Sequence, residues 1–286
     1  MRASVWLQYA LPHRFLSRVV MWATRWTFAP WKDFLIRRIV AAYDVDMRQA
    51  AQPDPSAYAH FNAFFTRTLK AGARPPTADA DAIACPADGR VSQSGAITQG
   101  RLLQAKGQTF SAAELLADDE RAAAYVEGSF LTVYLSPRDY HRVHMPLAGE
   151  LVETSHVPGR IFSVAPFAVA EIPRLFARNE RLVCHFESEH GPFAVVLVGA
   201  MLVSGIETVW SGVEVPPYAS RIRREDWRGR DIRLARDAEL GRFNMGSTVI
   251  VLLPAGVGRF DATLAPEQKV LVGEPVGRLA ASQNVT

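Results

Sequence analysis

Short apolar runs rich in β-branched residues dominate the chain from about Ile83 onward, and they limit the possible fold more than any other feature. Three of them are residues 130–135 (FLTVYL), 193–198 (FAVVLV) and 247–253 (STVIVLL). Gly or Pro residues flank each run, and these residues favour turns and so end strands. The pattern therefore predicts a mainly β region.

Two helices are expected to interrupt this region. One runs from Ser111 to about Ala117, because a serine before an apolar segment can cap a first helical turn. The other runs from Val169 to Asn179 and carries Pro173 early in its length, where a helix tolerates proline.

Residues 1 to about 70 instead show the apolar spacing of helices, interrupted at Pro12, at Pro30 and at the pair Pro53 and Pro55. Several short helices are expected there. We therefore predict an α+β protein with a helical region, residues 1–70, and a β-rich catalytic core, residues 71–286.

The helical region is basic and aromatic, although the whole chain has a net charge of only +3, too small to indicate nucleic-acid binding. Residues 1–50 hold eight Lys or Arg against three acids, and four of the six tryptophans. Such helices favour the boundary between an anionic membrane and water. The alternative is an arm that packs on its own core or on another subunit.

A spanning helix is not expected, because Arg18 and Arg25 interrupt the most apolar stretch, Phe15 to Trp31. A cleaved signal peptide is not expected either, since no uninterrupted apolar segment precedes a small-residue cleavage site. Cys85 and Cys184 are expected to be reduced thiols.

Two segments, Cys85–Val91 and Val272–Leu279, resemble the Gly-rich turns of lipoyl and biotin carrier domains, which are flattened β-sandwiches with internal pseudo-symmetry. This likeness concerns the fold alone. A carrier presents a modified lysine at a hairpin tip, and Lys269, the only lysine near these turns, lacks that setting.

Gly246-Ser247-Thr248 has the composition needed by a chain that cuts itself. The hydroxyl of Ser247 can attack the preceding carbonyl, and Gly246 lets the backbone bend toward that attack. Serine needs a base, and histidine suits that role near neutral pH. His141 and His144, three residues apart, are candidates. On a helical turn they could also bind a metal, but no further ligands stand at useful spacing, so no metal is expected.

Several segments, in this order and spacing, resemble those of the phosphatidylserine decarboxylases, membrane-bound enzymes that make their own pyruvoyl cofactor. They are FNAFFTR (61–67), CPADG (85–89), YLSPRDYHRVHMP (134–146), VPGRIFSV (157–164), LFARNER (175–181) and GRFNMGSTVI (241–250). One difference is Met245, where the family more often has Leu, a swap that conserves volume and apolar character.

The resemblance implies roles for individual residues. Asp88 orients His144, which deprotonates Ser247, in the logic of a serine-protease triad applied once to the chain's own backbone. Cleavage between Gly246 and Ser247 then gives chains 1–246 and 247–286, the second of 286 − 246 = 40 residues. Ser247 becomes the pyruvoyl group that forms a Schiff base with the substrate amine.

By the same resemblance, His141 is assigned to the protonation step of decarboxylation, and Tyr134 is a weaker candidate for substrate contact. The implied reaction converts phosphatidylserine into phosphatidylethanolamine and carbon dioxide. The implied setting is a peripheral protein on the cytoplasmic side of a bacterial cell membrane, in which the two cut chains stay associated and form a homo-oligomer.

Two rival functions remain open at this point. A pyruvoyl decarboxylase for a soluble amino acid would leave the basic, aromatic arm unexplained. A carrier-like β module anchored to a membrane would leave Asp88, His144 and Ser247 unexplained. Because these three residues lie in the β-rich core, removal of residues 1 to about 40 is expected to leave self-cleavage intact.

Overall fold

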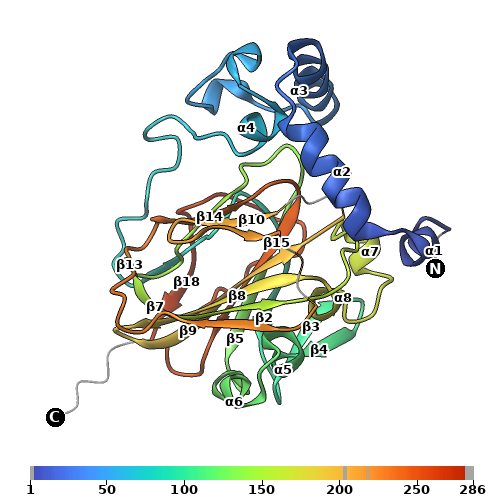
Figure 1. Cartoon of the computed structure of the whole chain (residues 1–286). Coiled ribbons are helices and arrows are strands. Elements are labelled where there is room, and N and C mark those ends of the chain that lie inside the picture. The colour runs from blue at the N-terminus through green and yellow to red at the C-terminus, as the bar shows by residue number, and fades with distance from the viewer. Residues whose placement is uncertain (1–2, 202–204, 217, 219, 281–286) are drawn as a thin grey trace.

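The first helices lie along one side of the molecule, and antiparallel sheets with a few short helices form the rest, so the predicted α+β class is confirmed (Figure 1). The computed structural model describes residues 3–201, 205–216, 218 and 220–280. Figure 1 shows the first three helices, in blue, following one edge of the β-rich body.

The first helices are short, as the prolines predict. Pro30, however, lies in the first turn of its helix, where the missing N–H is not needed, so it starts this helix. The helical elements up to residue 65 are α1 (Ala3–Ala10), α2 (His13–Arg25), α3 (Ala29–Tyr43), η1 (Met47–Gln49), η2 (Pro55–Ala57) and α4 (Phe61–Phe65). The first strand begins at Ala82.

Nine strands of the described residues form the largest sheet, in the order β12-β7-β8-β9-β15-β5-β2-β17, with β13 also paired to β7. Their bounds are β2 (Gly89–Ala96), β5 (Ser129–Leu135), β7 (Gly149–Val157), β8 (Arg181–Ser188), β9 (Gly191–Gly199), β12 (Arg223–Asp226), β13 (Arg233–Leu234), β15 (Ser247–Leu253) and β17 (Lys269–Val270). The three runs with which the sequence argument began are β5, β9 and β15, and they lie side by side at the centre of this sheet.

Three smaller sheets complete the strands. One has the order β11-β10-β14-β6, a second β1-β18-β16, and a third pairs β3 with β4. Their bounds are β1 (Ala82–Ala84), β3 (Arg101–Ala105), β4 (Gln108–Ser111), β6 (Arg142–His144), β10 (Ile206–Thr208), β11 (Gly212–Val215), β14 (Glu239–Phe243), β16 (Gly258–Phe260) and β18 (Pro275–Leu279).

Side chains alternate between two cores across strand β15. Val249, Val251 and Leu253 pack in a core with β6, β10 and β14 of the four-stranded sheet. Ile250 and Leu252 pack in a second core on the opposite face, under the short helices α5 (Ala112–Leu116), α7 (Pro166–Val169) and α8 (Leu175–Arg178). Burial on both faces explains why the run reads as continuously apolar. By the same period of two, Ser247 faces the four-stranded sheet.

One predicted helix is confirmed and the other is wrong. Ser111 caps α5 in a capping box with Glu114. The segment 169–179 is not one helix: α7 ends at Val169, and a new short helix starts after Arg174, which has a left-handed φ of 54°. Pro173 supplies no N–H and clashes with the preceding turn, so a helix cannot continue through it.

The two turns that resemble carrier domains bind each other. The amide of Cys85 donates to the carbonyl of Glu274 at 2.8 Å, and that of Gly273 donates to the carbonyl of Cys85 at 3.1 Å. The thiols of Cys85 and Cys184 are both buried and free.

Candidate active site

The candidate nucleophile stands where the chain crosses between two sheets. Strand β14 ends at Phe243 in the four-stranded sheet, and β15 begins at Ser247 in the large one. Ser247 is fully buried, and its Oγ has no hydrogen-bond partner. Buried hydroxyls normally find a partner, so this one is available for chemistry.

The backbone just before Ser247 is bent into an uncommon conformation. Met245 has a φ of 115° and Gly246 a φ of 27°. A non-glycine residue at positive φ costs on the order of 1–3 kcal/mol, and such strain collects at functional sites. A Cβ on Gly246 would meet no atom within 4 Å, so glycine is required here for its conformation and not for lack of space.

His144 ends strand β6 and is neither on a helix nor bonded to Asp88. Its Nδ1 lies 2.7 Å from the carbonyl oxygen of Asp237, and its Nε2 lies 3.2 Å from the hydroxyl of Tyr140. A carbonyl only accepts, so Nδ1 carries the proton and Nε2 keeps its lone pair, to which Tyr140 donates. In the neutral ring, the lone pair of His144 therefore lies at Nε2.

Asp88 is buried and bound to an arginine. Its carboxylate accepts from Arg74 through Nε, at 2.8 Å, and through Nη2, and from the backbone amide of Val272 at 2.9 Å. The next residue, Gly89, approaches strand β5 so closely that a Cβ would lie 2.2 Å from the carbonyl oxygen of Tyr134. Glycine therefore lets Asp88 stand beside β5, the strand paired with β15.

His141 is fully buried beneath the helical region. Its ring lies 4.0 Å, between centroids, from that of Phe65 in α4. Its Nδ1 lies 2.9 Å from the carbonyl oxygen of Asp139, and its Nε2 has no partner. Burial, helped by the charge of Arg67, lowers the pKa of His141 to about 3, so the ring is neutral near pH 7.

Tyr134 lies on the other face of the large sheet. Its ring packs against the second core, whereas its neighbours Val133 and Leu135 belong to the core that Ser247 faces. It stands opposite Thr248, not Ser247, across strands β5 and β15. Burial raises the pKa of Tyr134 to about 12. A contact of Tyr134 with substrate stays a prediction.

A polar cleft of about 270 Å³ lies beside Asp88 and beside Tyr140, the residue that contacts His144. Asp88, Arg74, Tyr140, Arg67 and Lys269 are among the residues that line it. Arg67 is almost fully buried, and its Nε and Nη1 have no partner. Five basic side chains and four aspartates line the cleft, so it holds charges of both signs next to the hydroxyl that contacts His144.

The sequence argument did not identify Arg74, Tyr140 or Arg67. Tyr140 and Arg67 belong to the segments that carry the family resemblance, which was a signal for them. Arg74 lies in no motif, and only its contact with Asp88 reveals it.

Fold and site together define an α+β protein with a free, buried serine directly after a strained turn. A family model described as phosphatidylserine decarboxylase matches residues 61–278, and a second, described as PSD, matches residues 3–44. The phosphatidylserine decarboxylase proenzyme of Xanthomonas euvesicatoria pv. vesicatoria (strain 85-10) is 59% identical over 273 residues, which cover 95% of this chain and 97% of that protein. That of Xylella fastidiosa (strain M23) is 56% identical over 268 residues, covering 94% and 92%. The chain belongs to the phosphatidylserine decarboxylase family.

Proposed function

We propose that Ser247 cuts the chain at its own amide bond to Gly246, with His144 as the base and Asp88 in support. The product is a pyruvoyl-dependent decarboxylase that converts phosphatidylserine into phosphatidylethanolamine and carbon dioxide. The proposal depends chiefly on one observation: the Ser247 Oγ is buried, unpartnered and adjacent to two residues of positive φ. Membership of the family favours this substrate over a soluble amino acid and favours an enzyme over a carrier.

The self-cleavage can be written from this chain's own atoms. The Oγ of Ser247 bonds to the Gly246 carbonyl carbon, the C–N bond breaks, and an ester replaces the amide. Loss of the Cα proton then breaks the Cβ–Oγ bond, which leaves a carboxylate on Gly246 and a dehydroalanine at position 247. Water adds and ammonia leaves, so the new N-terminus is a pyruvoyl group.

In this scheme His144 takes the Ser247 proton at Nε2. In the uncut chain this nitrogen accepts from the Tyr140 hydroxyl. Tyr140 must therefore either move away or relay the proton from Ser247 to His144. Catalytic hydrogen bonds are often completed only in the reacting complex. Asp88 acts on the same residues through the polar cleft, which Tyr140 also lines.

The pyruvoyl group would sit at position 247, and the surroundings fit it, because the Ser247 side chain from which it derives is fully buried and so shielded from water. Its paired carbonyls supply an electron sink for the loss of carbon dioxide. His141 is neutral with a free Nε2, so it must first gain a proton before it donates one. The negative carboxylate of a bound substrate would raise its pKa and allow this.

The polar cleft is our candidate for the serine phosphate headgroup. Five basic side chains line it, against four aspartates, and the Nε and Nη1 of Arg67 are buried without a partner. An anion in this cleft would lie beside Tyr140 and hence near His144.

Association of the two cut chains is supported by the position of β15. Residues 247–253 pair with β5 on one side and with β9 on the other, both of which belong to residues 1–246. β17 pairs with β2, and β18 pairs with β1. The small chain is therefore interleaved with the large one. A homo-oligomer stays a prediction.

Membrane contact is supported by α2, which exposes large apolar side chains together with the basic Arg14 and Arg18. Phe15, Val19, Trp22 and Trp26 recur at helical spacing and are between 44% and 65% exposed. The buried residues of α2 are instead polar: His13, Ser17 and Thr24. A helix that turns apolar residues outward is typical of one that lies in a lipid interface.

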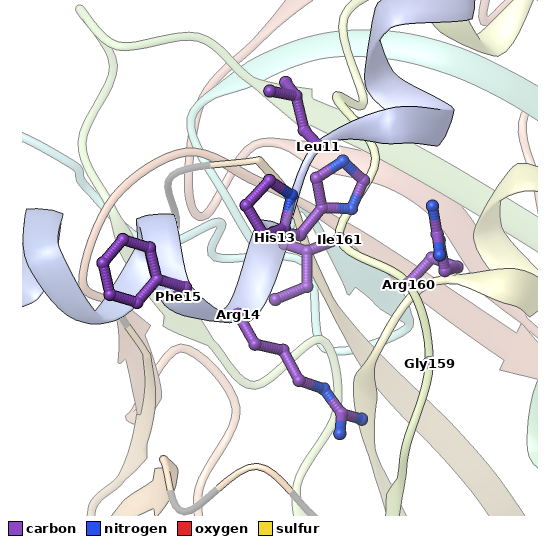
Figure 2. A pocket seen from close by; sticks show the side chains of 8 residues that line it. Leu11, His13, Arg14, Phe15, Gly159, Arg160 and Ile161 are labelled. Atoms are coloured by element: carbon purple, nitrogen blue, oxygen red, sulfur yellow. The ribbon is translucent and has the colours of Figure 1, made fainter.

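A second cleft, of about 390 Å³, opens where α2 begins (Figure 2). Arg14 extends from α2 and Arg160 from the facing loop, on either side of apolar residues that include Ile161. Basic side chains beside exposed aromatic ones suit anionic headgroups. Among the described residues, no helix is both long and apolar enough to cross a bilayer. The cytoplasmic side of a bacterial membrane stays a prediction.

Mass spectrometry of the purified protein tests the proposed function. We expect two chains, 1–246 and 247–286, with the small chain blocked at its N-terminus by a ketone that reacts with hydrazines. Addition of phosphatidylserine vesicles should release carbon dioxide. A single intact chain with decarboxylase activity would contradict the proposal.

A further inference from the structure

The loop that leads to Ser247 is held by one fully buried side chain, that of Asn244. Its Nδ2 donates to Oε1 of Glu207 at 2.8 Å, and its Oδ1 accepts from Nδ2 of Asn62 at 3.0 Å. Its backbone amide also donates to the carbonyl of Gly205 at 2.8 Å. The chain is thus fixed two residues before the proposed cut.

The charge of Glu207 decides which way the Asn244 amide points. Burial alone would raise the pKa of Glu207, but hydrogen bonds from Asn244 and Arg242 outweigh it and hold the pKa below its ordinary value. The carboxylate is therefore ionised near pH 7 and can only accept. Nδ2 of Asn244 must face Glu207, and its Oδ1 must face Asn62.

The two partners of Asn244 come from different parts of the molecule. Glu207 lies in β10 of the four-stranded sheet, and its second oxygen accepts from Arg242 at 2.6 Å. Asn62 lies in α4 of the helical region. Arg25, the last residue of α2, stands 3.8 Å from Glu207 as well. Asn244 therefore joins the sheet to the helices.

The next residue is anchored by the same helices. Met245 packs against a cluster of buried apolar side chains from α3, α4 and the segment after α3. These are Ile36, Val45, Phe61, Phe64 and Phe65. The positive φ of Met245 and Gly246 is thus maintained between two anchored side chains and the start of β15.

We propose that Asn244 is a positioning residue for self-cleavage. Two hydrogen bonds hold its side chain, one to Glu207 and one from Asn62; we call this pair of bonds the clamp, and the helical region supplies the second of them. This inference rests on the proposed cut between Gly246 and Ser247. Attack requires the serine oxygen close to the Gly246 carbonyl carbon and correctly angled, and the orientation of that carbonyl follows from the residues just before it. The helical region is then part of the maturation machinery as well as a surface for lipid.

This changes the expectation for truncation. Removal of residues 1 to about 40 would delete Arg25 and Ile36, which contact Glu207 and the cluster that holds Met245. The three triad residues would remain, but the loop would lose part of its support. We therefore expect the truncated chain to cut more slowly.

The test compares self-cleavage rates after cell-free synthesis, followed on denaturing gels. Asn62→Ala removes the donor from the helices. Asn244→Asp places a second carboxylate against Glu207. Both should slow the cut on the order of 10- to 100-fold, the range expected for a misplaced reacting group. The double variant Asn244→Asp with Glu207→Gln restores a donor facing an acceptor, so its rate should return to within about threefold of the parent rate.

Lys32→Ala is the matched control. Lys32 is a buried polar residue of α3 that binds Asp33 and the carbonyl of Ser56, away from the loop. It should leave the rate unchanged. All variants are also made with Ser247→Ala, and their thermal midpoints should agree within a few degrees. A slow cut that tracks a lowered midpoint would overturn the positioning role, as would parental rates in Asn62→Ala and Asn244→Asp.

Peptide mapping of the parent protein distinguishes failure of the proposed cut from failure of the positioning role of Asn244. If the parent does not cut between Gly246 and Ser247, the proposed function fails. If it does and the double variant stays as slow as Asn244→Asp alone, only the clamp fails.

Discussion

Arg74 grips the Asp88 carboxylate in a bidentate ion pair, with Nε 2.8 Å from one oxygen and 3.1 Å from the other. Both side chains are largely buried, at 15% and 5% exposure. In the uncut chain, Asp88 is therefore bound by Arg74, which also lines the polar cleft, and not by His144. Any support that it gives to His144 acts across that cleft.

We expect Arg74→Gln and Asp88→Asn to destabilise the uncut protein to a similar degree, by about 3 kcal/mol, because each leaves a buried partner unpaired. The rate of self-cleavage should distinguish the two variants. Asp88→Asn should accumulate precursor, whereas Arg74→Gln, which keeps the carboxylate, should still cut. Equal cutting rates in the two variants would mean that Asp88 matters only to stability.

Ser247→Ala should give a single uncut chain, because a methyl group replaces the hydroxyl that would attack the Gly246 carbonyl. Ser247→Cys should cut slowly, since a thiol is a good nucleophile. Thr248→Val is the control: its hydroxyl is also buried and unpartnered but lies on the other face of the sheet. Two chains from Ser247→Ala on a denaturing gel would refute the assignment.

The two histidines should fail at different stages. His144→Ala should accumulate precursor, because the Nε2 base is lost. His141→Ala should mature but decarboxylate at least 10-fold more slowly per pyruvoyl group, as expected when a general acid is removed. Precursor in His141→Ala but not in His144→Ala would show that the roles are exchanged.

Stability should fall in acid partly because of His141. Burial lowers its pKa to about 3, below its ordinary value of 6.5. The unfolded chain therefore binds the proton first, so folding stability decreases as pH falls from about 6.5 toward 3, by roughly 1.4 kcal/mol per pH unit for one such group. Burial also lowers the pKa of His185, to about 4, which adds to the slope.

Urea unfolding of Ser247→Ala protein between pH 7.5 and pH 4.5 measures this slope. His141→Asn in the same background should flatten it, because the group that titrates on unfolding is absent. Thr248→Val, which removes no titratable group, is the comparison and should keep the parental slope. An unchanged slope in His141→Asn would exclude a buried, neutral His141.

Binding to vesicles should depend on the outward face of α2 and on the exposed arginines of α3. Trp22→Ser, which removes a ring that is 65% exposed, should weaken binding at both low and high salt, since the lost contact is apolar. Arg37→Gln with Arg38→Gln should weaken it chiefly at low salt, by about 1 kcal/mol per charge. Val213→Ser, at a 52% exposed position in β11, is the control. Co-sedimentation that is unaffected by Trp22→Ser would place the membrane contact elsewhere.

The amino-acid sequence by itself determined the local elements whose pattern is strong. The apolar, β-branched run 247–253 predicted a strand, and Ser111 before an apolar segment predicted the start of a helix; both are confirmed. The order of motifs also identified the family. The sequence argument was wrong for 169–179: it placed Pro173 early in one helix, whereas two short helices, α7 and α8, lie on either side of this proline.

Only the tertiary structure decided which distant residues meet. Three contacts have no signal in the sequence spacing, because they depend on how sheets and helices pack: Arg74 with Asp88, His144 with the carbonyl of Asp237, and Asn62 with Asn244. The last pair joins residues 182 positions apart. Packing also set the positive φ of Met245, since neighbours on both sides restrain a conformation that the residue alone would avoid.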